Sequence, residues 1–387
     1  MAFSPAMTRD PESPAPRPAR LDVRLGVVAE NYLRMIAVAG NARVAPVVKA
    51  DAYGVGLVTV VRRLADEGAD VFFVARLAEG IALRALVPAA RIFVFDGLAL
   101  GQAPVFAAHG LIPALNTPSE IAAWQSFARE SRVALDAALQ VDTGMNRSGL
   151  SSADVAELSR TSRDALADLN LVLVMSHLAC DSDAAHAANR RQLERFRTAL
   201  AMLPPAPASI AATGGLHLGR DYLFDLVRPG IGLYGGHPGG SGASPYAMAV
   251  RLTAPVIQLR HIEKGATVGY GATFTAARAT RLAIVAMGYA DGLMRSAGPR
   301  GYAVVAGQRV KFAGRISMDL CALDVTDLPE NAVMPGTEVE FLGDAISLEE
   351  AGEAWGTNHH EVLTSISPRV VRNFVIHNDV VRNHVES

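Results

Sequence analysis

Eight short apolar runs, which alternate with segments of helical composition, most constrain how this chain of 387 residues can fold. The runs are Val44–Val48, Val71–Val74, Ile92–Phe95, Leu111–Leu115, Leu135–Val141, Leu171–Met175, Ala208–Ala212 and Asp225–Val227. The segments between them are rich in Ala, Leu and Arg, as in Ser152–Leu158 and Ala187–Leu203. Continuous apolar strands that alternate with helices are typical of parallel sheets covered by helices. Eight such units, within roughly 200–250 residues, predict a (β/α)8 barrel.

The composition changes after the eighth run, at the Gly-rich stretch Gly235–Gly242. Short alternating strands follow, and Gly and Pro separate them: Val250–Leu259, Ala266–Val268, Arg281–Val285, Tyr302–Val305, Arg309–Phe312, Cys321–Val325 and Glu338–Leu342. We therefore expect a flexible tail over residues 1–20, a TIM-like (β/α)8 barrel over 21–245 and a C-terminal mainly β domain over 246–387.

The same sequence pattern has two alternative interpretations. An open doubly wound sheet would also alternate strands with helices, but Lys49–Gly56 does not match its glycine-rich fingerprint. The stretch Gly235–Gly242 could cradle a phosphate, but no strand-to-helix pattern follows it. The barrel with a linker after it therefore remains the prediction.

Composition excludes several classes of protein. Half of the residues are hydrophobic and the formal net charge is −2, which favours a globular protein with no electrostatic attraction to nucleic acid or an anionic membrane. The first twenty residues lack the apolar core of a signal peptide, and no apolar run is long enough to span a membrane. Two cysteines, Cys180 and Cys321, are too few for a disulfide framework. We expect a cytoplasmic enzyme without a metal.

Lysine is rare in this chain, and one lysine ends a predicted strand. The 36 Lys and Arg residues include only Lys49, Lys264 and Lys311 as lysines. Lys49 follows the first apolar run, at the strand end where barrel enzymes carry their functional groups. Arginine cannot act as an amine nucleophile, so a Schiff base to an aldehyde cofactor is the simplest chemistry that requires lysine there. A solvated surface lysine is the alternative.

The last two predicted strands end in groups that suit a phosphate. Thr213 follows the seventh run and offers a hydroxyl group, while Gly230 and Ile231 follow the eighth and offer backbone amides. Barrels often bind phosphate with the loops after these two strands. A phosphate site together with a reactive lysine indicates pyridoxal 5′-phosphate (PLP) as the cofactor.

At this point the chain resembles the alanine racemase family of barrel-type PLP enzymes, from about residue 22 to 375. Six segments carry the resemblance, in the family's order: Lys49–Gly56, Asp142–Gly149, Arg228–Gly235, Gly288–Gly292, Gly314–Asp319 and Glu361–Arg372. The resemblance implies reversible racemisation of L-alanine to D-alanine, as in D-alanine biosynthesis, with a small amino acid as substrate.

The resemblance also implies a role for each matching residue. Lys49 would form the internal aldimine and act as one base, and Tyr289 would act as the other. The expected cofactor ligands besides Lys49 are Tyr53, Thr213, Gly230, Ile231 and His360 around the phosphate, Arg228 at the pyridine nitrogen, Arg147 at the phenolate oxygen, and His177 beside the ring. Arg147 and Met318 would contact the substrate.

In this family the second base comes from a neighbouring subunit. The resemblance therefore implies a homodimer in which Tyr289 and Met318 reach into the partner's active site. Two bases on opposite faces of Cα can remove a proton from one side and return one to the other. Because a guanidinium gives up its proton reluctantly, Arg228 should leave the pyridine nitrogen unprotonated, which favours reprotonation over other reactions.

Four positions depart from the family pattern. Gln140 stands where many members have a lysine that orients the arginine, so it offers Arg147 a neutral carbonyl. Thr213 replaces a serine and keeps the hydroxyl, and Ser209 replaces a histidine behind Arg228. His360 replaces a tyrosine that narrows the pocket. We therefore expect the pocket to accept a side chain larger than methyl, such as that of serine.

Other readings stay open at this stage. Arg228 could pair with Asp225, His177 could be a core histidine or pair with Cys180, and His359-His360 could bind a metal. Among functions, a broader amino-acid racemase, a related PLP decarboxylase and a non-catalytic PLP-binding protein share parts of the pattern. The sequence does not distinguish a biosynthetic from a catabolic role.

Overall fold

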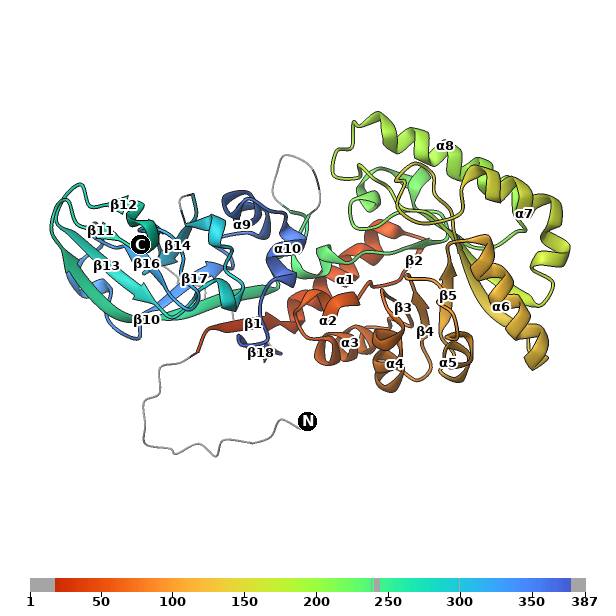
Figure 1. Ribbon diagram of the computed structural model, residues 1–387, viewed down its shortest axis with the longest axis horizontal. Helices are drawn as coiled ribbons and strands as arrows, with labels where there is room; N and C mark the ends of the chain where they lie inside the picture. Colours follow the sequence, from red (N-terminus) through yellow and green to blue (C-terminus); the bar gives the residue numbers. More distant parts are fainter. Residues whose placement is uncertain (1–17, 238, 240–243, 299, 377–387) are drawn as a thin grey trace.

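The computed structural model describes residues 18–237, 239, 244–298 and 300–376. Within these residues the molecule is elongated, with a barrel at one end and a mainly β half at the other (Figure 1). Most of the expected N-terminal tail, residues 1–17, lies outside the described residues, as do residues 238 and 240–242 of the Gly-rich stretch.

Six parallel strands form most of the barrel wall, in the order β3-β4-β5-β6-β7-β8. They are β3 (Val71–Val74), β4 (Arg91–Val94), β5 (Ile112–Leu115), β6 (Leu135–Gln140), β7 (Leu169–Met175) and β8 (Ala208–Ser209). Each begins within two residues of a predicted apolar run, because burial in the barrel wall favours apolar residues over most of each strand.

Two further short strands, β2 (Arg43–Val44) and β9 (Leu226–Val227), close the ring as a parallel pair. The backbone N–H of Val48 donates to the carbonyl of Phe73 at 2.9 Å, which joins the β2 segment to β3. On the other side Asp225 N–H donates to the carbonyl of Ala208 at 3.1 Å, which joins β9 to β8. The predicted (β/α)8 barrel is thereby confirmed.

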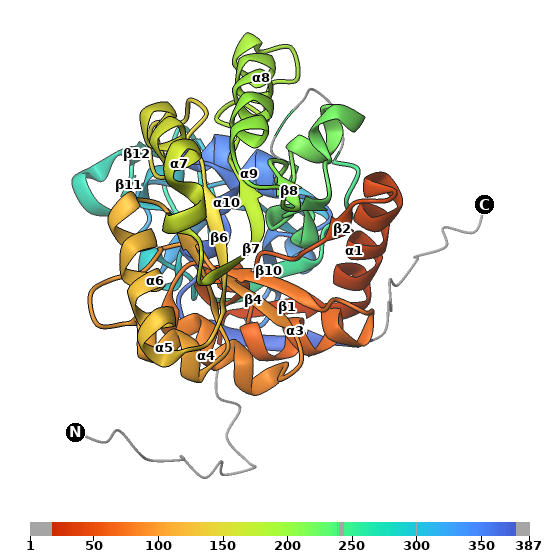
Figure 2. The ribbon, with the colours of Figure 1, turned by 90° about the vertical axis from the view of Figure 1, so that its right-hand side faces the viewer.

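Helices surround the strands on the outside of the barrel (Figure 2). They are α1 (Leu25–Ala39), α3 (Leu57–Asp66), α4 (Leu77–Leu86), α5 (Ala103–Ala108), α6 (Pro118–Ser131), α7 (Ser152–Ala165) and α8 (Ala187–Met202), and the short α2 (Lys49–Tyr53) follows the β2 segment. Where helices would be expected after strands β8 and β9, and before the second half begins, the described chain forms only 3-10 turns. They lie at Gly215–His217, Arg220–Tyr222 and Ile231–Tyr234. The mouth of the barrel is therefore built largely of loops on this side.

The second half is mainly β, as predicted. Its main sheet runs β15-β14-β17-β10-β1-β18, with β13 and β16 paired beyond β10. Its strands are β10 (Val250–Ile262), β13 (Thr280–Val285), β14 (Tyr302–Val305), β15 (Gln308–Lys311), β16 (Cys321–Asp324), β17 (Glu338–Leu342) and β18 (Val371–Val375), with β11 (Thr267–Val268) and β12 (Phe274–Thr275) as a separate pair.

The two ends of the described chain tie the halves together, which the sequence patterns did not predict. Strand β1 (Arg20–Arg24) precedes the barrel but pairs with β10 and β18. Helices α9 (Leu348–Trp355) and α10 (His359–Thr364) lie beyond β17, and α10 packs against α2 between the two halves (Figure 1). This packing brings His360 to the mouth of the barrel. In the described part of the chain, no helix is long and apolar enough to cross a membrane.

Candidate active site

Two adjoining cavities open at the carboxyl ends of the barrel strands. The smaller, of about 160 Å³, is lined by eight of the predicted cofactor residues: Lys49, Tyr53, His177, Thr213, Arg228, Gly230, Ile231 and His360. The larger, of about 600 Å³, contains the ninth, Arg147, together with Gln140. Lys49, Phe95, His177 and Arg228 line both cavities, so the two form one continuous cleft around the lysine.

Lys49 is half-buried at the centre of this cleft. Its Nζ atom lies 5.9 Å from the centroid of the Phe95 ring. Burial lowers the pKa of the amine and the cation of Arg147 lowers it further, while Glu79 and Asp96 raise it. Because a lowered pKa leaves more of the amine neutral, this environment suits a lysine that reacts with an aldehyde.

The backbone after Lys49 is left-handed over four successive residues that are not glycine. The φ angles are 53° at Ala50, 56° at Asp51, 54° at Ala52 and 61° at Tyr53. Left-handed backbone costs an L-residue roughly 1–2 kcal/mol each. The turn brings Lys49 and Tyr53 to the same cavity, so the strained geometry directly shapes the cleft.

Arg228 is buried, and its guanidinium has two partners. It donates to the hydroxyl of Ser209 and to the backbone carbonyl of Ser176. Among the described residues no ion pair joins Arg228 to Asp225, whose carboxylate accepts from Ala208 N–H at 2.7 Å. Burial lowers the pKa of Arg228 to about 9, so the group stays charged at neutral pH. The other donors of the guanidinium are free to face the cleft.

Residues that carry hydroxyl groups, Tyr53 and Thr213, and the backbone of Gly230 and Ile231 line the smaller cavity. The Thr213 hydroxyl accepts from Gly230 N–H at 3.1 Å and from Gly232 N–H at 3.4 Å. A Cβ at Gly230 would lie 2.0 Å from the Tyr53 hydroxyl, so only glycine fits there. Among the described residues, Asp181 is the only acid that lines this cavity, and burial raises the pKa of its carboxyl. Hydroxyls, amides and an excess of cations fit a phosphate group.

Two histidines border the cavity in their neutral form. Burial lowers the pKa of His177 to about 3, with the cations of Arg228, Arg147 and Lys49 acting in the same direction. The side chain of His360 is exposed at the rim, and its ring centroid lies 5.9 Å from that of Tyr53. Partial burial lowers the pKa of His360, and His359 and Lys49 lower it further.

Gln140 and Arg147 share a wall of the larger cavity. Among the described residues, no hydrogen bond joins the Gln140 amide to Arg147. The Gln140 carbonyl therefore shares the cavity with the exposed Arg147 without holding it in this conformation.

Tyr289 and Met318 lie together in the second half of the molecule. Tyr289 N–H donates to the Ser317 carbonyl at 3.0 Å, and Ala290 N–H donates to the Met318 carbonyl at 2.9 Å. Their side chains are 42% and 52% exposed. Neither residue lines the two cavities, so this subunit's own cleft does not contain the predicted second base.

Three residues of the site were missed by the sequence analysis: Phe95 under Lys49, Asp181 at the phosphate end, and Glu79 beside the left-handed turn. Phe95 ends a predicted strand, and that position was the available signal for it. Asp181 lies in a loop and Glu79 in the first turn of α4, and both act through contacts with the backbone of other segments, which follow no periodic pattern.

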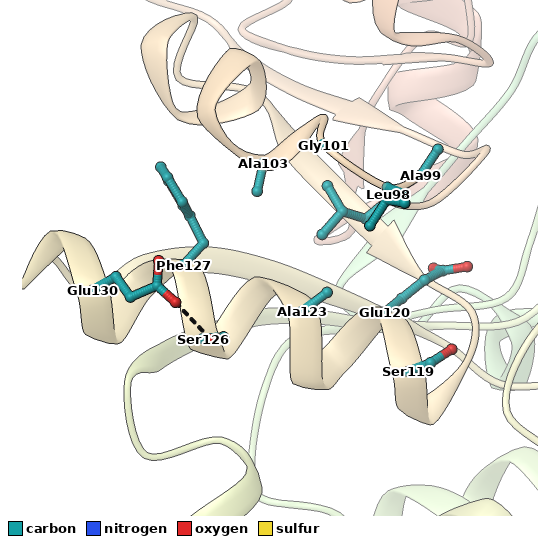
Figure 3. A pocket seen from close by; sticks show the side chains of 11 residues that line it. Leu98, Ala99, Gly101, Ala103, Ser119, Glu120, Ala123, Ser126, Phe127 and Glu130 are labelled. Carbon is teal, nitrogen blue, oxygen red and sulfur yellow. Dashed lines mark hydrogen bonds between the residues drawn. The ribbon is translucent and has the colours of Figure 1, made fainter.

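A separate hollow of about 380 Å³ lies between the Leu98–Ala103 segment and α6 (Figure 3). Of the described residues that line it, only Glu120 and Glu130 are charged, and Glu130 accepts a hydrogen bond from Ser126 at 3.0 Å. Without lysine, histidine or arginine in its lining, this hollow lacks the nucleophile and the cations that the main cleft contains. In the described part of the chain, no group of three or more His, Cys, Asp or Glu residues could hold a metal.

The fold and the cleft define a class: barrel enzymes that hold a phosphorylated aldehyde cofactor on a lysine at the strand ends. Two family models match, the alanine racemase N-terminal domain over residues 23–238 and the C-terminal domain over residues 249–374. The chain belongs to the alanine racemase family.

Individual relatives agree with the family models. A catabolic alanine racemase of Agrobacterium fabrum is 43% identical, covering 92% of each chain, and the biosynthetic alanine racemase of the same organism is 41% identical, covering 94% of this chain and 95% of the relative. Among solved structures, the Bartonella henselae alanine racemase with covalently bound pyridoxal phosphate has a TM-score of 0.90 at 35% identity, covering 93% of this chain and 100% of that one.

Proposed function

We infer that this chain is a PLP-dependent alanine racemase, in which Lys49 is one base and Tyr289 of a second subunit is the other. A single observation carries the inference: the half-buried Lys49, with its lowered pKa, joins a phosphate-type cavity to a cavity that contains Arg147. An amino acid with its carboxylate on Arg147 would present its Cα beside the lysine.

When bound, PLP withdraws electrons from the Cα of an attached amino acid and makes its proton acidic. Lys49 removes or returns that proton on one face, and an opposing group must act on the other. Tyrosine has an ordinary pKa of about 10, so Tyr289 needs a cation or hydrogen-bond donor near it in the assembled site. Arg147, His177 and Arg228 line this cleft and could supply one.

Arg228 would face the pyridine nitrogen and keep it unprotonated. Its contacts with Ser209 and Ser176 support this role, because they hold the guanidinium while leaving further donors for the cofactor. An unprotonated ring would withdraw electrons more weakly, which would favour return of a proton to Cα over other reactions. This argues against the decarboxylase alternative.

A homodimer would complete each active site. Tyr289, Met318 and Leu320 are exposed by 42%, 52% and 38%, and exposed apolar groups that gather on one face are typical of interaction surfaces. The absence of Tyr289 from its own subunit's cleft supports donation to a partner.

Cys180 and Cys321 are both free thiols, which supports a cytoplasmic location.

A broader racemase remains the second candidate, because His360 borders the smaller cavity where family members usually have tyrosine. The smaller ring would leave room for the serine hydroxymethyl group. The relatives include both a catabolic and a biosynthetic enzyme at similar identity, so identity alone does not favour either role.

Polarimetry tests the proposal. Purified protein with added pyridoxal phosphate should bring solutions of L-alanine and of D-alanine to the same zero rotation. Protein that binds the cofactor but leaves both rotations unchanged would instead be the non-catalytic homologue, and the proposed function would be wrong.

A further inference from the structure

The turn that follows Lys49 needs an external support. Four left-handed residues in a row, Ala50–Tyr53, are disfavoured for L-amino acids, and no glycine relieves them until Gly54. Within the turn, Ala52 N–H donates to the Val48 carbonyl at 3.0 Å and Gly54 N–H donates to the Ala50 carbonyl at 2.7 Å. The N–H of Ala50, directly after Lys49, has its partner on another element.

That partner is the carboxylate of Glu79, in the first turn of α4. Its Oε1 accepts from Ala50 N–H at 2.7 Å. Its Oε2 accepts from Ala75 N–H at 2.8 Å and from Arg76 N–H at 3.0 Å. One side chain thus joins the start of the left-handed turn to the end of β3, the strand beside the Lys49 segment in the barrel wall.

Helix capping alone does not explain these contacts. A capping glutamate at the start of α4 needs to accept only from the backbone at the helix start, which Oε2 does. Oε1 instead accepts from the N–H of Ala50, the residue that follows Lys49. Glu79 forms no ion pair within the described residues. The three hydrogen bonds that its carboxylate accepts all come from backbone amides.

We propose that Glu79 is a positioning residue for Lys49: its carboxylate fixes the left-handed turn and thereby aims the lysine amine into the cleft. The effect of this positioning on catalysis rests on the proposed function. The positioning itself concerns how the Lys49 amine meets the cofactor. The negative charge of Glu79 also favours the protonated amine, so its removal should lower the pKa of Lys49 further.

The central test is Glu79→Gln. A glutamine has the same length, but its amide NH2 must face either Ala50 N–H or the N–H pair of Ala75 and Arg76, where a donor meets a donor. We expect kcat for alanine to fall about 100-fold with KM within about threefold, because a small misplacement of a reacting group costs about this much. Covalent capture of pyridoxal phosphate by apo protein, followed by the visible absorbance of the lysine-bound cofactor, should slow in parallel.

Glu350→Gln is the matched control. Glu350 also begins a helix, where its Oε2 accepts from Ser347 N–H at 3.1 Å, but it lies away from the cleft. It should lose a similar amount of thermal stability while keeping wild-type kcat and capture rate. If the Glu79→Gln protein matches this control in both rates, the proposal is wrong.

Rescue separates positioning from a general loss of structure. Glycine adopts left-handed backbone without strain. Ala50→Gly in the Glu79→Gln background should therefore raise the capture rate about three- to tenfold above that of Glu79→Gln alone. The same change in the Glu350→Gln background should not raise the rate. No rescue would contradict the proposal. Glu79→Asp, which keeps the charge but is too short for both contacts, should lower the capture rate at least about tenfold and serves if the glutamine variant does not fold.

The capture assay also keeps the two proposals apart. If wild-type protein captures the cofactor but does not racemise alanine, the proposed function fails. The effect of Glu79 is still measured by the rate of capture, and equal rates in the Glu79→Gln and Glu350→Gln proteins would contradict the positioning role alone.

Discussion

The guanidinium of Arg228 donates a hydrogen bond to the hydroxyl of Ser209, and both side chains are buried behind the cleft. Ser209 occupies the place of the histidine that the family resemblance predicts. A small hydroxyl therefore supports the buried cation here, together with the Ser176 carbonyl.

Replacement of Ser209 by alanine should destabilise the protein, because the change leaves a buried charged donor without its partner. We expect the free energy of unfolding to fall by about 1.5–3 kcal/mol in urea denaturation. Ser126→Ala, on the exposed side of α6, should change it by no more than about 0.5 kcal/mol. Equal effects of the two variants would mean that the contact between Ser209 and Arg228 contributes nothing to the free energy of unfolding.

Stability should depend on pH through His177. Its pKa is about 3 in the folded chain, mainly because of burial, against an unfolded value of about 6.5. Between these values the unfolded chain binds a proton that the folded chain does not, so stability is full above pH 6.5 and falls as the pH decreases. For apo protein, the free energy of unfolding should drop by about 2–3 kcal/mol from this residue between pH 7 and pH 4.5. The His177→Gln variant should lack that part of the decrease. If its stability depends on pH in the same way as that of the wild type, this prediction is wrong.

Substrate choice should depend on His360. We expect wild-type kcat/KM for L-serine to lie within about a hundredfold of that for L-alanine. His360→Tyr should narrow the pocket and increase the preference for alanine by about 10–200-fold, since a small steric difference in a pocket is worth roughly 1–3 kcal/mol. His261→Tyr, exposed on β10, is the control. A wild-type preference for alanine stronger than a hundredfold would remove the case for a wider pocket.

The sharing of active sites between subunits can be tested by mixing inactive variants. Lys49→Ala and Tyr289→Phe should each be inactive. In a mixed dimer one site keeps both wild-type bases if Tyr289 serves the partner, so random mixing should restore about a quarter of wild-type activity. Mixtures that stay inactive although mixed dimers form would show that both bases act within one subunit.

The barrel strands could be predicted because their central residues are buried and therefore appear as mostly apolar runs, as at Val71–Val74. Strand β1 could not, since its partners β10 and β18 lie hundreds of residues away in the chain. The left-handed turn also escaped prediction, because alanine, aspartate and tyrosine give no signal for positive φ.

The site followed a similar division. Lys49, Arg228 and Thr213 stand at strand ends, so the fold itself brings them together. Asp181 lies in a loop, and the contact of Glu79 with Ala50 joins α4 to a turn 29 residues earlier, so neither role has a signal in the sequence pattern. The catalytic role of Tyr289 stays a prediction, because its position in the second half of the chain becomes meaningful only in an assembled dimer.

Lys49→Arg tests the central claim most directly, because arginine keeps the positive charge but cannot form a covalent bond to the cofactor. The measurement is the optical rotation of L-alanine incubated with wild-type and variant protein, each supplied with pyridoxal phosphate. We predict that the wild type brings the rotation to zero and that the variant leaves it at its starting value. A variant that racemises alanine at a rate near that of the wild type would contradict the account.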